Sequence, residues 1–112
     1  MKSLDELWKR IVEFNDRYFP NWRETELVYL SNAIAGETGE LCNLVKHFVG
    51  GGTRAYEEPI TNIDFFEELF DIFVYSVLFS EGINIDKEDF CKYAEDRMKE
   101  LERRMKRKNE VE

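Results

Sequence analysis

The chain has 112 residues, of which 43% are hydrophobic and 36% charged, and its formal net charge is -8. This length suffices for one domain with a single core, and the apolar share excludes a disordered chain. The acidic excess argues against a nucleic-acid partner, since phosphate backbones are bound through basic surfaces, and an anionic ligand would need a bridging cation.

The sequence has no apolar run near the roughly 20 residues of a membrane span. Its first residues, MKSLDELWKR, lack the apolar core of a signal peptide. We therefore expect a cytoplasmic protein with no membrane partner. Cys42 and Cys91 are too few for a disulfide framework, so we expect both to be reduced packing residues inside helices.

Four helices are predicted and no strand, because alternation of β-branched and polar residues is not sustained anywhere. The first helix follows a capping box that begins at Ser3, and its apolar residues recur at helical spacing. The second starts within residues 21–25 and ends at Val49, before three glycines. We allow for a kink near Gly36 and Gly39.

The third helix follows a polar loop over residues 50–60. Thr61 or Asn62 caps it, and Gly82 closes it. Apolar residues cover every side of this helix. We therefore expect it to be buried, either within the chain's own bundle or in a subunit contact.

Asp86, with Asp89 three residues later, caps the fourth helix. This helix is expected to fade into a basic tail from about residue 105. Residues 97–112 hold seven Lys or Arg against four Glu, so the rest of the chain is strongly acidic. A solvated helix end is the simplest interpretation of the tail, because cations suit the negative end of the helix dipole.

Two pairs of acidic residues fall on apolar helix faces. At about 100° per residue, Glu37 and Glu40 lie within an apolar stripe of the second helix, and Glu68 and Asp71 lie one turn apart in the third. Buried carboxylates repel one another and lose charge unless a cation lies among them. Mg²⁺ prefers oxygen ligands of this kind, with Mn²⁺ as a substitute, so the pattern predicts a site for such an ion.

Other interpretations of the acidic pairs remain open. The acids could pair with Lys or Arg, or lie on a solvated face, as a single ExxE in a charged helix commonly does. The chain could then be a non-catalytic helical association module. A di-iron carboxylate site is disfavoured, because it uses Glu-x-x-His on two helices and this chain has one histidine, His47.

Several stretches resemble the MazG-like all-α nucleoside triphosphate pyrophosphohydrolases, relatives of the dCTP pyrophosphatases and dimeric dUTPases. They are GETGEL (36–41), Lys46, EELFD (67–71) and Tyr75, and the resemblance covers about residues 19–104. It implies a single MazG-like helical domain over the chain, a four-helix bundle completed by oligomerisation as a homodimer or homotetramer.

The resemblance also implies an activity. Such an enzyme uses Mg²⁺ to cleave a (d)NTP between the α and β phosphorus atoms, giving the monophosphate and pyrophosphate, and serves nucleotide-pool house-cleaning. Phosphoribosyl-ATP pyrophosphohydrolase is an alternative activity, because this related enzyme would use the same kind of metal site. The implied metal ligands are Glu37, Glu40, Glu68 and Asp71, and Glu37 and Glu40 are the catalytic candidates, because one of them would accept a proton from the attacking water.

Six residues are candidates for substrate binding. Trp22 and His47 would flank a nucleobase, although core packing for the first and a surface position for the second remain open. Lys46 would meet a phosphate, or lie on a solvated face. Tyr75 would reach a ligand oxygen, or pack in the core. The remaining two candidates are Lys92 and Asp96.

These last two come from the C-terminal signature of the family, Lys-Met-x-x-Asn. In one register Asp96 stands where relatives have Asn, after Lys92; in the other, Arg97 and Leu101 stand where relatives have Lys and Asn. We favour the first register because Asp96 is at least polar.

Overall fold

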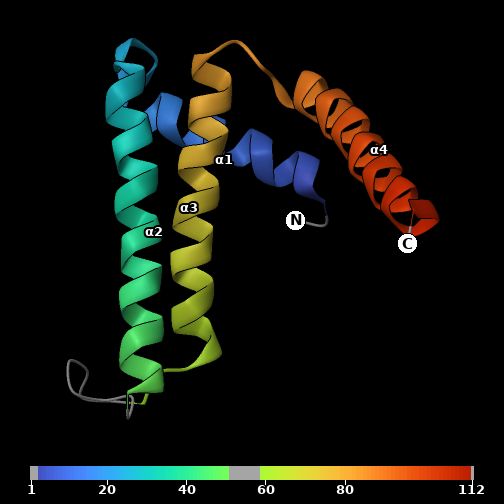
Figure 1. Ribbon diagram of the computed structural model, residues 1–112. Helices are drawn as coiled ribbons and strands as arrows, with labels where there is room; N and C mark the ends of the chain where they lie inside the picture. Colours follow the sequence, from blue (N-terminus) through green and yellow to red (C-terminus); the bar gives the residue numbers. More distant parts are fainter. Residues whose placement is uncertain (1–2, 51–58, 112) are drawn as a thin grey trace.

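The structure is a computed structural model that describes residues 3–50 and 59–111. Within those residues it contains helices and no strands, which confirms the all-α prediction (Figure 1). The elements are α1 (Leu4–Tyr18), the 3₁₀ turn η1 (Trp22–Glu24), α2 (Leu27–Val49), α3 (Asn62–Gly82) and α4 (Lys87–Val111).

Side-chain caps start three of the helices at the positions that the sequence predicts. Ser3 Oγ accepts a hydrogen bond from the Glu6 N–H at 3.2 Å. Thr61 and Asp64 form a reciprocal capping box, in which the Thr61 N–H donates to Asp64 Oδ2 at 2.7 Å. Asp86 accepts from the N–H three residues later at 2.9 Å. Each cap satisfies N–H groups that have no partner within their own helix.

Helix α2 begins later than expected. Residues 22–24 form the separate turn η1, and Thr25 and Glu26 then adopt extended backbone conformations before α2 starts at Leu27. The helix continues without a break through Gly36 and Gly39, near which a kink was allowed for. It ends at Val49 as predicted.

Two further predictions concern the ends of segments. Helix α4 continues to Val111, beyond residue 105 where its fading was expected. Ion pairs one turn apart, such as Arg104 with Glu100 at 3.0 Å, stabilise the C-terminal half of this helix. The predicted polar loop over 50–60 falls mostly on residues 51–58, which lie outside the described residues.

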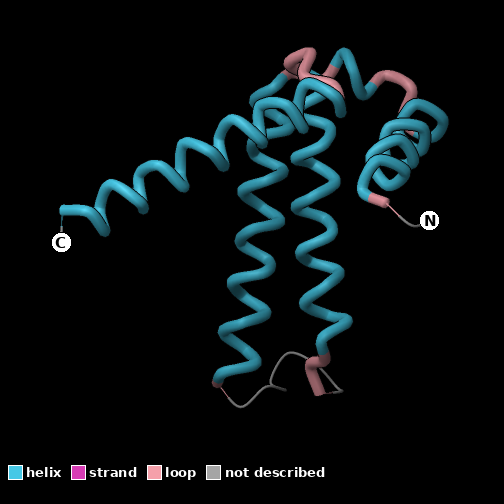
Figure 2. The backbone as a smooth tube through the Cα atoms, turned by 90° about the vertical axis from the view of Figure 1, so that its right-hand side faces the viewer, coloured by secondary structure: helices cyan, strands magenta, loops and turns pink. Residues whose placement is uncertain are grey.

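Helices α2 and α3 lie side by side and antiparallel, and α1 crosses them near the end where α3 finishes (Figures 1 and 2). The core sits at this crossing. The indole N–H of Trp8 donates to Glu81 Oε1 at 2.8 Å, which ties α1 to α3. The buried core residues are Trp8, Ile11, Trp22, Leu30, Val77 and Leu78.

Helix α4 departs from the other three helices after a short turn (Figures 1 and 2). Asn84 in this turn has φ 63, a left-handed conformation that asparagine tolerates better than most residues. The start of α4 contacts α1 through Phe90 and Trp8, whose ring centroids are 5.1 Å apart. One chain therefore does not close the predicted four-helix bundle, because α4 is held mainly at its first turn.

Because α4 does not cover α2 and α3, apolar residues expected to be buried are exposed. Val77 and Leu78 of α3 are buried, but Ile63, Phe66 and Leu69 are more than half exposed. Burial of the whole of α3 within the chain's own bundle is therefore wrong.

The cysteines differ from their prediction as well. Cys42 and Cys91 are free thiols, but both are exposed, so a packing role within the single chain is wrong. Cys42 lies on α2 and Cys91 on α4, and the open side of each helix accounts for the exposure. In the described segments, none of the helices combines the length and apolar composition needed to cross a membrane.

The core position makes a stability prediction. Leu78→Ala should lower the free energy of unfolding by about 3 kcal/mol, because it removes buried methyl groups and leaves a cavity. The matched control is Leu4→Ala, since Leu4 is 73% exposed, and its effect should stay within about 0.5 kcal/mol. Urea denaturation of both variants measures the difference, and equal effects would contradict the core assigned here.

Candidate metal centre

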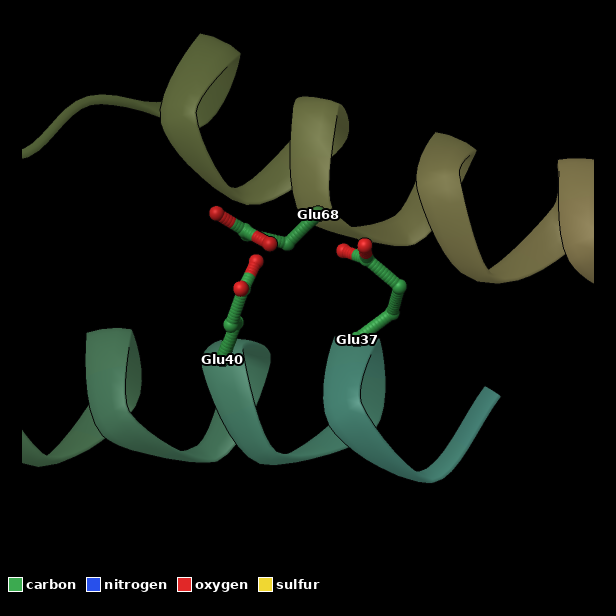
Figure 3. Close-up of side chains that lie close together, drawn as sticks. All are labelled: Glu37, Glu40 and Glu68. Carbon is green, nitrogen blue, oxygen red and sulfur yellow. The ribbon is translucent and has the colours of Figure 1, made fainter. Parts of the chain in front are cut away.

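The antiparallel pairing of α2 and α3 brings the two acidic pairs to the same level. Glu37 and Glu40 project from α2 toward Glu68 on α3 (Figure 3). One carboxylate oxygen from each of the three residues lies within 4.8 Å of the other two. We call these three residues the glutamate cluster. Three of the four acids that the resemblance implies as metal ligands therefore lie together.

The fourth acid, Asp71, lies one turn beyond Glu68 and outside this tight group. Its negative charge nevertheless acts on both Glu37 and Glu68, whose pKa values it raises. Asp71 thus belongs to the same electrostatic environment without being one of the three nearest oxygen donors.

The burial of the acids differs from the prediction. Glu40 and Asp71 are exposed, whereas Glu37 and Glu68 are half-buried. The expectation that all four lie in the core is wrong, because no helix of the described chain covers this side of α2 and α3. Burial is nonetheless complete for Glu37 Oε2 and Glu68 Oε2, and neither atom has a hydrogen-bond partner among the described residues.

Neighbouring negative charge and burial act together on the cluster. Burial raises the pKa of Glu37 most, followed by the charges of Glu40 and Asp71. Burial likewise raises the pKa of Glu68 most, again followed by Glu40 and Asp71. Within residues 3–50 and 59–111, none of the four acids forms an ion pair with Lys or Arg.

This donor set fits a hard divalent cation. All the donors are carboxylate oxygens, and Glu37 and Glu68 each also have a buried carboxylate oxygen without a partner among the described residues. Burying an unpaired carboxylate is costly, and a cation between the oxygens would offset both the desolvation and the mutual repulsion. The salt-bridge interpretation of these acids finds no partner in the described part of the chain.

A cleft of about 740 Å³ opens beside the cluster, between α1 and α3. Glu37 and Asp71 reach its wall, and aromatic side chains form much of the remainder. The cleft is therefore apolar with acidic groups on one side, a composition common in small-molecule sites. Its aromatic lining residues are Phe14, Phe19, Phe66, Phe70 and Tyr75.

Tyr75 is the substrate-binding candidate that lines this cleft together with Glu37 and Asp71. Burial raises the pKa of its hydroxyl most, followed by the charges of Tyr29, Glu37 and Asp71. The phenol therefore keeps its proton at neutral pH and remains a hydrogen-bond donor.

The other candidates on η1 and α2 do not line this cleft. Trp22 is a buried core residue, whose indole N–H donates to Asp16 Oδ1 at 2.8 Å. The Arg23 guanidinium lies 4.4 Å from its ring centroid. Lys46 is exposed near the end of α2, and His47 beside it is half-buried.

Lys92 and Asp96 are exposed on α4. Helix α4 leads away from α2 and α3, so within one chain it does not bring these two residues to the glutamate cluster (Figures 1 and 2). The structure therefore does not test which register of the C-terminal signature applies.

Helix α1 contributes two polar cleft residues that the sequence did not single out. They are Arg10 and Asn15, and Asn15 is buried, with its side-chain amide donating to the Ile11 carbonyl at 3.0 Å. A polar residue one turn after Ile11 on an apolar stripe was an available signal for Asn15. No such signal existed for Arg10, because the crossing of α1 over α3 is a non-local contact.

Comparison of the chain with protein-family models, with curated proteins and with solved structures finds no match in any of the three.

The raised pKa values predict how the metal-free protein responds to pH. The native state binds more protons than the unfolded state between the usual glutamate value, 4.5, and the raised values of Glu37 and Glu68. The free energy of unfolding should therefore fall as pH rises through this interval, and the loss should be complete above it. Glu37→Gln should thus stabilise the protein at pH 7 more than at pH 4.

Chemical denaturation in the presence of a chelator measures this difference. Glu24→Gln is the control, because Glu24 is an exposed acid on η1. An equal effect of the two substitutions across this pH range would contradict the electrostatic strain assigned to the cluster.

Proposed function

We propose that the chain is a Mg²⁺-dependent pyrophosphohydrolase that cleaves a (d)NTP to the (d)NMP and pyrophosphate. The observation that carries the proposal is the glutamate cluster beside an aromatic cleft, with two buried carboxylate oxygens that lack partners. The resemblance of GETGEL and EELFD to the MazG-like enzymes supports the same activity.

The proposed ligands of the ion are Glu37, Glu40 and Glu68, with Asp71 as a fourth acid beside them. Three oxygens within 4.8 Å of one another suit one small cation, and the exposed position of Glu40 leaves a side open to solvent. An open side is needed because Mg²⁺ keeps part of its water shell and meets phosphate oxygens from its substrate. In a chain of formal net charge -8, such an ion would reduce the repulsion between the carboxylates and a triphosphate.

The cleft suits the rest of a nucleotide. Its volume of about 740 Å³ lies within the range of about 300–1,000 Å³ typical of small-molecule sites. Phe14, Phe66 and Phe70 offer flat apolar surfaces for a base, and Tyr75 offers a hydroxyl to a sugar or phosphate oxygen. Arg10 adds a cationic side chain to the same wall.

The chemistry divides between the ion and the chain. When bound, the cation would neutralise charge that develops on the phosphates and lower the pKa of a water molecule. One of the two residues Glu37 and Glu40 would accept the water's proton at a carboxylate oxygen. Glu40 is the better placed of the two, because its carboxylate is exposed on the open side.

The active protein is proposed to be a cytoplasmic homodimer or homotetramer. The exposed apolar residues Ile63 and Leu69 of α3, which do not line the cleft, would be covered in such an assembly. Candidates that one chain leaves away from the cleft would then act from a neighbouring copy. These are Lys46, His47, Lys92 and Asp96.

The first test combines thermal melting with product analysis. Mg²⁺ at about 100 times its Kd should stabilise the protein by about 2.7 kcal/mol, because it binds the folded state. A panel of natural and modified nucleoside triphosphates, with phosphoribosyl-ATP included, should show release of pyrophosphate. Glu40→Gln should lower kcat by about a hundredfold or more.

Glu67→Gln is the matched control, because Glu67 is exposed and adjacent to Glu68 but outside the cluster. It should retain kcat within about threefold, since surface changes of this kind have small effects. If Mg²⁺ leaves the melting temperature unchanged and no triphosphate is cleaved, the enzyme proposal fails and the association module remains.

Tyr75→Phe tests the cleft separately from the metal. It keeps the ring, which packs against the core cluster, but removes the hydroxyl. We expect KM to rise by about tenfold, the effect of one lost hydrogen bond, while the stabilisation by Mg²⁺ is unchanged. An unchanged KM would remove Tyr75 from the substrate contacts.

A further inference from the structure

One face of α4 carries apolar residues at the alternating three- and four-residue spacing of a coiled coil. We call it the α4 seam. Met98 and Met105 are 52% and 57% exposed, and Leu101 is 37% exposed, so no described part of the chain covers it fully. The seam residues are Cys91, Ala94, Met98, Leu101 and Met105. In heptad terms Cys91, Met98 and Met105 take a positions, and Ala94 and Leu101 take d positions.

The seam has a defined length. From Cys91 to Met105 it spans about 21 Å at 1.5 Å per residue, which is two heptads. It ends because the next seam position holds Lys108, where two copies would bring like charges together. A pairing of this length is weak unless other contacts between the copies support it.

Charged residues flank the seam in a fixed order. Arg97 precedes Met98 at a g position, and Glu102 follows Leu101 at an e position. Other charges on α4 are paired within the helix, such as Glu95 with Lys99 at 3.7 Å. Neither Arg97 nor Glu102 belongs to an ion pair in the part of the chain that the structure describes.

We propose that two copies of the chain pair through the α4 seam as a parallel, in-register helix pair. In this arrangement each g residue lies beside the e residue of the next heptad in the partner helix. Arg97 of each copy would then meet the partner's Glu102, which makes two symmetric ion pairs. The two charges left unmatched in one chain become partners across the pair.

The same pattern disfavours an antiparallel pair. In that arrangement g positions face g positions and e positions face e positions. Arg97 and Arg104 would face arginines, and Glu95 and Glu102 would face glutamates. The proposed parallel pairing depends on α4 alone. Its test is therefore independent of the enzyme activity and of any contact through α3.

Cys91 provides the test, because it lies at a seam position and is exposed. In a parallel, in-register pair it faces the partner's Cys91, within the separation that a disulfide can bridge. The full chain with Cys42→Ser leaves Cys91 as the remaining thiol. Mild oxidation of this variant should give a disulfide-linked dimer on non-reducing gels, and the rate of its formation is the readout.

A charge exchange identifies the pairing. In the Cys42→Ser background, Arg97→Glu or Glu102→Arg alone should slow dimer formation by about tenfold, since two attractive contacts become repulsive. The double variant with both changes should restore the rate to within about twofold, because the ion pairs reform with reversed sign. Arg107→Glu is the control, because at about 100° per residue it lies far from the seam, and it should leave the rate unchanged.

Circular dichroism of each variant confirms that α4 remains helical. Absence of the Cys91 disulfide would overturn the proposal. The proposal would also be overturned if the Cys91 disulfide formed at the same rate whatever the charges at positions 97 and 102, because such a disulfide would arise from random collisions. Slowing by both single changes without rescue in the double variant would also overturn it, since it would mean that each charge meets a different partner.

Discussion

The constraint on which the structure depends is the antiparallel contact between α2 and α3. This contact places Glu37, Glu40 and Glu68 on facing helices, with their nearest oxygens within 4.8 Å of one another. Like charges at this separation oppose the same packing that brings them together, and burial of Glu37 and Glu68 adds to the cost. A chain built for stability alone would place apolar residues here, and the proposed binding of a cation would account for the exception.

The other half of the candidate site comes from α1. Its tie to α3 through Trp8 and Glu81 holds α1 across the pair of long helices, and the cleft opens beneath this crossing. The core and the cleft thus share a helix, with Ile11 contributing to both. Arg10 and Asn15 enter the site for the same reason. Stability at the crossing and access to the acids are therefore linked through the placement of one helix.

Local signals in the sequence were sufficient for most of the fold. Caps at Ser3, Thr61 and Asp86 depend on residues three or four positions apart, and so does the shared face of Glu37 and Glu40. Burial was harder to predict. An apolar stripe shows which face of a helix is suited to burial, but it does not show whether another part of the same chain packs against that face. Glu40, Asp71 and the cysteines were assigned to the interior on that basis and are exposed. Arg10 was missed because its neighbours lie far away in the sequence.

The turn between α3 and α4 has a consequence for how the molecule can vary. Asn84, with φ 63, reverses the local handedness of the backbone and thereby sets the direction in which α4 leaves. Because the direction of α4 depends on the backbone angles of these few residues, an insertion or deletion in the turn would change the direction in which α4 leaves and the face that it turns outward. The length of this short connection therefore sets the angle between α4 and the α2–α3 pair that carries the glutamate cluster.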